Sequence, residues 1–172
     1  MNKTMIVGAL MAAGSLVLGT AASAQGLTAK TLLDHAQIED LITRYYNNFG
    51  RSNGQSFGSF YADDAEMVLG PNSFKGKEAI EGLYKSPAMA ATPQRKSFAF
   101  NIVLSNVQVI VEGTTARARA LFTETIVENK GDAPRILTQG REFDTFVKVG
   151  GVWKFKKRQI MGAEGMPADW KD

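Results

Sequence analysis

The first half of the chain carries the hydrophobic spacing of helices. Between residues 32 and 49, apolar residues recur at steps of three and four: Ile38, Leu41, Ile42, Tyr45 and Phe49. This spacing predicts an amphipathic helix that ends at the polar, glycine-containing segment 50–54. Shorter helices are predicted over residues 57–61 and 76–85, with a short strand at 67–69 between them.

The second half has the pattern of long strands. Segments 97–111, 115–128, 136–149 and 152–161 are rich in β-branched and aromatic residues and alternate in part with polar ones. Tight turns separate them, and Gly150-Gly151 is typical of a two-residue hairpin. Helices followed by four antiparallel strands predict an α+β domain, in which a strongly curved sheet carries the helices on one face.

The N-terminus has the three parts of a secretory signal peptide. A short positive start precedes an uncharged apolar run at 5–18, and Ala22-Ser23-Ala24 supplies a small-x-small cleavage site. We expect residues 1–24 to be removed, residues 25–172 to form one domain, and the product to be periplasmic or secreted. An uncleaved membrane anchor is the alternative, although the run is short for a transmembrane helix.

Composition narrows the chemistry that the side chains can supply. The chain has no cysteine and one histidine, which excludes a thiol nucleophile, a thiolate metal site and a site with several histidines. Twenty basic residues against 17 acidic ones leave a net charge of +3, which is no nucleic-acid footprint by itself. We therefore expect no metal, no cofactor, no nucleic-acid partner and no membrane contact after signal cleavage.

Three segments in order resemble the SnoaL-like group of the nuclear-transport-factor-2-like superfamily. They are residues 38–64 with Arg44-Tyr45, Phe60-Tyr61 and Ala62-Asp63-Asp64, residues 105–109, and residues 140–144 followed by 151–158. The resemblance implies a conical barrel, in which the curved antiparallel sheet wraps a long N-terminal helix and encloses an apolar cavity, and also a homodimer. Members include scytalone dehydratase, ketosteroid isomerase, polyketide cyclases, cofactor-free lyases of aromatic dimers, and non-catalytic binding proteins.

The chain departs from this group at the positions that usually carry the chemistry. Gly50 stands where enzymatic members have an aspartate, and Ile102 and Val103 stand where one or two histidines are common. Glu142 replaces a usual tyrosine. The group's standard proton-transfer pair is therefore missing, so that either other residues act or the protein does not catalyse.

Tyr45, Glu124 and Arg141 are the candidate catalytic residues. The Tyr45 phenol would donate to a substrate oxygen, unless it is a satisfied core tyrosine. Glu124 lies on the opposite strand face from Arg117 and Arg119, so an inward orientation would bury it and raise its pKa. A one-residue slip would instead bring Thr123 and Thr125 to the cavity wall. Arg141 would stabilise a developing anion if it faces inward.

Candidate substrate contacts are Tyr46, Tyr61, Asn101, Phe122 and Phe143. Asn101 would bind a substrate oxygen, or else face solvent from its strand. Asp144 is expected to pair with Lys156 or Arg158 across the last hairpin.

Three functions remain open from the sequence. The first is a cofactor-free acid–base enzyme of the lyase, dehydratase or isomerase type, acting on a small apolar, aromatic molecule. The second is a periplasmic binding protein for a hydrophobic ligand, which the missing aspartate and histidines favour. The third is a scaffold whose exposed sheet recruits a protein partner.

Overall fold

The computed structural model describes residues 27–49 and 56–170. Its elements, in chain order, are α1 (Leu32–Asn48), the 3₁₀ helix η1 (Phe57–Phe60), β1 (Tyr61–Leu69), β2 (Asn72–Lys75), α2 (Lys77–Tyr84), α3 (Pro87–Ala90), α4 (Pro93–Lys96), β3 (Ala99–Glu112), β4 (Thr115–Val127), β5 (Arg135–Val149) and β6 (Val152–Gly162). The predicted signal peptide, residues 1–24, lies outside the described residues.

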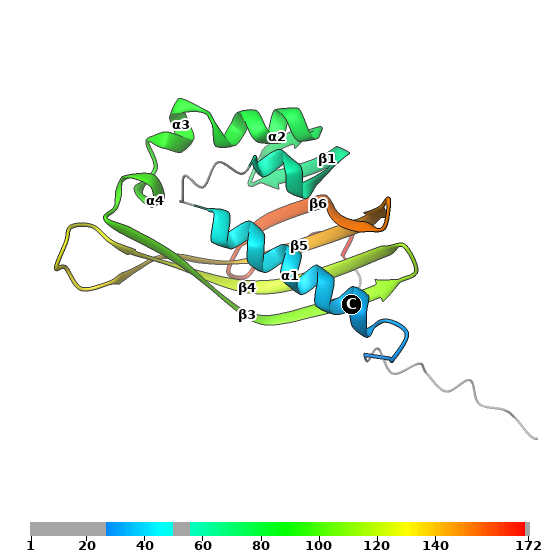
Figure 1. Cartoon of the computed structure of the whole chain (residues 1–172). Coiled ribbons are helices and arrows are strands. Elements are labelled where there is room, and N and C mark those ends of the chain that lie inside the picture. The colour runs from blue at the N-terminus through cyan, green and yellow to red at the C-terminus, as the bar shows by residue number, and fades with distance from the viewer. Residues whose placement is uncertain (1–26, 50–55, 171–172) are drawn as a thin grey trace, which may run out of the picture.

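One six-stranded sheet organises the domain, with the strand order β2-β1-β6-β5-β4-β3. It curves around α1, which lies across its inner face, while α2, α3 and α4 follow one another at one side of the cone (Figure 1). The α+β fold with a curved sheet is therefore confirmed. The sheet stays open between its edge strands β2 and β3, so the expected barrel is a cone that does not close.

The antiparallel meander is confirmed for β3, β4, β5 and β6, and the pairing of β1 beside β6 was not foreseen. That pairing is parallel, and between the two strands the chain passes to the opposite edge of the sheet, where β3 lies. The strand predicted at 67–69 is only the end of β1, which begins at Tyr61. Asp63 and Asp64 interrupt the apolar pattern there, since both face solvent and pair with Lys77 and Lys156.

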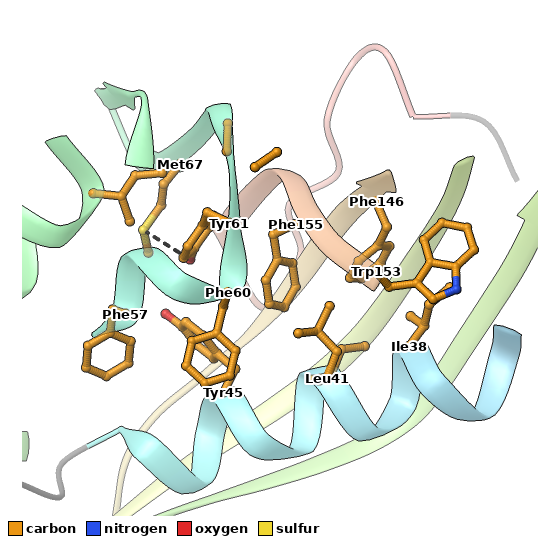
Figure 2. Packing of buried hydrophobic residues seen from close by; sticks show 14 of the residues in the cluster. Ile38, Leu41, Tyr45, Phe57, Phe60, Tyr61, Met67, Phe146, Trp153 and Phe155 are labelled. Atoms are coloured by element: carbon orange, nitrogen blue, oxygen red, sulfur yellow. Dashed lines mark hydrogen bonds between the residues drawn. The ribbon is translucent and has the colours of Figure 1, made fainter. Parts of the chain in front are cut away.

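The core lies between α1 and the inner face of the sheet. Ile38, Leu41 and Tyr45 point from the helix toward Phe155, Phe146 and Trp153 of the sheet (Figure 2). Ala116 and Ala118 of β4 are also buried in this core. Each large side chain buried here contributes roughly 1.5–3 kcal/mol, so this aromatic cluster fixes the helix on the sheet.

Among the described residues, no helix combines the length and the apolar character that a membrane crossing requires.

Candidate functional site

A cavity of about 200 Å³ lies between the C-terminal half of α1, the short helices and the inner face of the sheet. It is lined by Tyr45, Tyr46, Phe49, Met67, Leu69, Tyr84, Met89, Thr92, Gln94, Ile102, Phe122, Glu124, Arg158 and Ile160. Half of these side chains are apolar and three more are tyrosines with apolar rings, while the polar groups come from α1, α2, α4 and the residue before it, β4 and β6. The cavity thus has the composition of a small-molecule site.

Glu124 is the carboxylate of the cavity wall. It is half-buried on β4, and Gln94 Nε2 donates to its Oε2 at 2.9 Å. Burial raises the pKa of Glu124, and the hydrogen bond from Gln94 only partly opposes this. No ion pair joins it to a basic side chain within the described part of the chain. A carboxyl group in this setting can accept or release a proton nearer to neutral pH than an exposed one.

Two buried phenols form the second polar feature. The hydroxyls of Tyr45 and Tyr84 hydrogen-bond to each other, and Tyr84 also contacts Met67 Sδ at 3.5 Å. Burial raises the pKa of Tyr45 and of Tyr84 well above the ordinary value. Both groups are therefore neutral hydroxyls, which can orient a polar atom of a ligand without carrying charge.

Arg158 connects the cavity to a buried charge cluster, defined here as Arg158, Glu142, Asp144 and Tyr46. The Arg158 guanidinium lies 4.0 Å from the centre of the Tyr45 ring, and its Nη2 donates to the hydroxyl of Tyr46 at 2.7 Å and to Glu142. Tyr46 in turn donates to Glu142. Arg158 Nε lies 3.4 Å from Asp144 Oδ1.

The cluster holds two carboxylates for one guanidinium. The side chains of Glu142, Asp144 and Arg158 are each only 1% exposed. Burial, together with the charge of Glu142, raises the pKa of Asp144 well above its ordinary value, although Arg158 opposes this. The expected pairing of Asp144 with Arg158 across the β5–β6 hairpin is confirmed, and the structure adds Glu142 to it.

Four of the predicted site residues line the cavity: Tyr45, Tyr46, Phe122 and Glu124. The predicted strand phase of β4 is correct, because Phe122 and Glu124 both face inward. Tyr61 is a core residue that packs on Phe155, with ring centres 5.3 Å apart, and it lies outside the cavity wall. The roles assigned to the cavity residues remain predictions.

Arg141, Phe143 and Asn101 do not lie in the cavity. Side chains alternate across a strand, and in β5 the inward set is that of Glu142 and Asp144, so Arg141 and Phe143 line a groove on the outer face. Asn101 is exposed on β3, while its neighbour Ile102 lines the cavity.

The cavity residues that were not predicted as site residues include three with polar side chains that hydrogen-bond inside the fold: Arg158, Tyr84 and Gln94. Arg158 had a signal in the sequence, because a basic residue opposite Asp144 across a hairpin shares its face. Gln94 comes from α4, a single turn with no periodic pattern, and nothing in the sequence pointed to it.

The positions that depart from the resemblance differ in their surroundings. Ile102 makes the wall apolar where a histidine was expected, whereas Val103 is 57% exposed on the other face of β3. Gly50 lies outside the described residues. Within residues 27–49 and 56–170, no three histidine, aspartate or glutamate side chains come together as metal ligands would.

Solved structures share this fold at low sequence identity. An NTF2-like protein with a cystatin-like fold from Novosphingobium aromaticivorans aligns with a TM-score of 0.68 and 22% identity over 81% of this chain and 88% of that chain. A protein of the same organism, provisionally named scytalone dehydratase, aligns with a TM-score of 0.65 and 21% identity over 82% of this chain and 99% of that chain. A third protein from this organism, provisionally named an aromatic ring hydroxylase, aligns with a TM-score of 0.60 and 21% identity over 78% of this chain and 91% of that chain. At these identities the likeness concerns the fold.

Comparison with the curated proteins gives no match. The sequence profile of the SnoaL-like domain, in contrast, matches residues 30–159, which is most of the chain from the first helix to the last strand. Together with the cone-shaped fold and its cavity, this match shows that the chain belongs to the SnoaL-like domain family.

Proposed function

We propose that this protein is a cofactor-free acid–base enzyme of the lyase, dehydratase or isomerase type, and that Glu124 moves the proton. The observation that carries the proposal is the setting of Glu124. It stands in a mostly apolar cavity with an amide as its hydrogen-bond partner, and burial raises its pKa. Perturbed carboxyl groups in a cleft are typical of general acids and bases.

The size of the cavity supports a substrate with a single ring. A dry apolar cavity of about 150 Å³ is large enough for benzene, whereas sites for drug-sized molecules reach about 300–1,000 Å³. A volume of about 200 Å³ therefore suits one substituted aromatic or alicyclic ring. The larger aromatic dimers and steroids handled by other members of the superfamily would require the cavity to open.

The remaining polar groups would orient the ligand and stabilise charge. Arg158 keeps its positive charge at every physiological pH, so its guanidinium can interact with negative charge that develops on a ligand oxygen. Tyr45 and Tyr84 supply neutral hydroxyls to the same cavity. These groups and Glu124 are sufficient for a reaction in which one proton moves and an anion forms beside Arg158.

The test compares the wild type with Glu124→Gln and with Glu128→Gln as the matched control. Glu128 follows the end of β4, is exposed and pairs with Arg135. The purified proteins are incubated with hydroxylated and unsaturated single-ring compounds, and mass spectrometry follows loss of water, fragmentation or formation of an isomer. We expect Glu124→Gln to lower kcat by about 10²–10⁴-fold and Glu128→Gln to leave it unchanged.

The pH profile gives an independent check on the role of Glu124. If Glu124 acts as the base, kcat/KM rises with pH through a pKa above that of an ordinary glutamate, because only the ionised form accepts the proton. Full turnover in Glu124→Gln would exclude the residue assignment. Absence of turnover in the wild type, with a ligand bound unchanged, would exclude the enzymatic function.

A non-catalytic binding protein is the second candidate. It is favoured by Ile102, which presents an aliphatic side chain to the cavity where the resemblance leads one to expect a histidine. In this case Glu124→Gln would bind the ligand as well as the wild type or more tightly, since the variant has no buried charge to desolvate.

Export and a homodimer complete the proposal. The apolar run at 5–18 and the Ala22-Ser23-Ala24 site support cleavage and a periplasmic or secreted location. The homodimer rests on the resemblance to the superfamily. Light scattering of the purified protein tests the dimer.

A further inference from the structure

The groove that contains Arg141 and Phe143 is a second site, separated from the cavity by the sheet. It has a volume of about 450 Å³, and its walls include Asn106, Gln108, Arg119, Arg141, Phe143 and Met166. It lies on the outer face of β3, β4 and β5, because Glu142 on the other side of the same strand belongs to the inner cluster. The groove has its own set of polar groups, which the proposed chemistry does not use.

Two arginines meet on one face at this groove. In the β4–β5 register, Arg119 is opposite Phe143 and Leu121 is opposite Arg141, so the two arginines are diagonal neighbours. Among the described residues that line the groove, none is acidic. Both guanidinium groups are positively charged at every physiological pH, so this part of the outer face attracts anions.

Arg141 itself lacks an acceptor. Its Nε is buried and makes no hydrogen bond within the described part of the chain. The Nε of Arg117, which lies on the same outer face, is also buried without a partner in the described part of the chain, but Nη1 of Arg117 donates to Glu112 at 3.3 Å. A buried donor without a partner is unfavourable, and a ligand oxygen in the groove would supply the missing acceptor.

An irregularity in β3 brings two amides to the same groove. The β3–β4 register shifts between Ser105 and Gln108, and Asn106 adopts a positive φ of 52°. Bulges of this kind are frequent beside functional sites, where they redirect side chains. Here the bulge places the amides of Asn106 and Gln108 in the groove that Arg141 lines.

We propose that the outer groove binds a small oxyanion, a carboxylate or a phosphate, with Arg141 as its main ligand. The planar guanidinium presents parallel N–H donors that match both anions, and Asn106 and Gln108 add neutral hydrogen bonds. Phe143 and Met166 give the groove an apolar side, which suits a carboxylate carried on a ring or short chain. The site is independent of turnover in the cavity.

The test titrates the purified protein with benzoate and, separately, with inorganic phosphate at low ionic strength. Nuclear magnetic resonance follows the Arg141 Nε–H and the side-chain amides of Asn106 and Gln108. We expect saturable shifts of these signals with at least one anion. Because a hydrogen bond to a charged group is lost, Arg141→Gln should weaken binding by about tenfold or more.

Arg141→Lys and Arg44→Gln complete the series. Arg141→Lys keeps the positive charge but loses the parallel N–H donors of the guanidinium, so it should bind the anion with intermediate affinity. Such binding would also show that the weaker binding in Arg141→Gln does not result from unfolding. Arg44 is exposed on α1 and pairs with Asp40, and Arg44→Gln should bind as the wild type does.

Tighter binding of benzoate assigns the site to carboxylates, and tighter binding of phosphate assigns it to phosphates. Shifts that do not saturate with either anion would overturn the proposal, as would equal affinity in Arg141→Gln. A dimer that dissociates in Arg141→Gln without anion binding would also overturn it, because the acceptor would then be a carboxylate of a second copy.

Discussion

Replacing Asp144 with asparagine tests the charge balance of the buried cluster. Glu142 and Asp144 face a single guanidinium, and all three side chains are excluded from water. Because the pKa of Asp144 is raised well above its usual value, the folded protein keeps the Asp144 proton over a pH range in which the unfolded chain has lost it. Asparagine imitates the protonated, uncharged form at every pH.

The magnitude follows from proton linkage. Below the unfolded pKa, near 4, both states of the wild type hold the proton, and the raised pKa contributes its full stabilisation. As the pH rises toward the folded pKa, the wild type loses about 1.4 kcal/mol of this stabilisation per pH unit, and Asp144→Asn loses none. The free energy of unfolding of the variant, relative to the wild type, should therefore increase by this amount per unit and level off at the folded pKa.

Urea unfolding at several pH values between 4.5 and 8 measures this difference. Trp153 is 3% exposed, so its fluorescence reports unfolding. Asp64→Asn is the matched control: its hydrogen bond with Lys156 lowers the pKa of Asp64, which is ionised in both states above pH 5, so its difference from the wild type should be flat there. A flat difference for Asp144→Asn would refute the reasoning, because Asp144 would then be ionised in the fold.

Three further outcomes are expected. Gly140→Ala should lower the free energy of unfolding by about 1–3 kcal/mol, because the new Cβ would lie 2.4 Å from the Met161 carbonyl oxygen and 2.5 Å from Phe122. Gly82→Ala, which meets nothing within 4 Å in α2, should raise it by about 0.5–1 kcal/mol, and thermal unfolding distinguishes the two signs. Intact-mass analysis of the exported protein should show a chain that begins at Gln25, whereas a chain beginning at Met1 would contradict the signal peptide.

The long periodic elements of the fold were predictable from the sequence. The helix at 32–49 and the four strands from residue 97 onward match the structure within two residues at each end, because each has many positions that agree on one face. The full extent of β1 was missed because its parallel neighbour β6 is more than 80 residues away along the chain. The short elements β2, α3 and α4 have four residues each, too few to establish a period.

The candidate site was predictable only as far as strand phase was known. Alternation correctly put Phe122 and Glu124 on one face, but it could not tell which face of β5 was inward. The apolar Phe143 made the face of Arg141 look suitable for a cavity, while burial of Glu142 and Asp144 required the compensating Arg158 from β6. A buried carboxylate is recognisable only when its partner is known, and that partner comes from tertiary structure.

The buried cluster links the stability of the fold to the proposed chemistry. Arg158 lines the cavity, and its positive charge is already paired with Glu142, which does not line the cavity. While Asp144 holds its proton, the cluster is neutral, and an anion that develops on a ligand beside Arg158 meets no excess negative charge. Loss of that proton adds a second carboxylate at 3.4 Å from Arg158 Nε, which weakens the positive potential in the cavity. The proton that stabilises the fold would therefore also keep Arg158 available to a ligand.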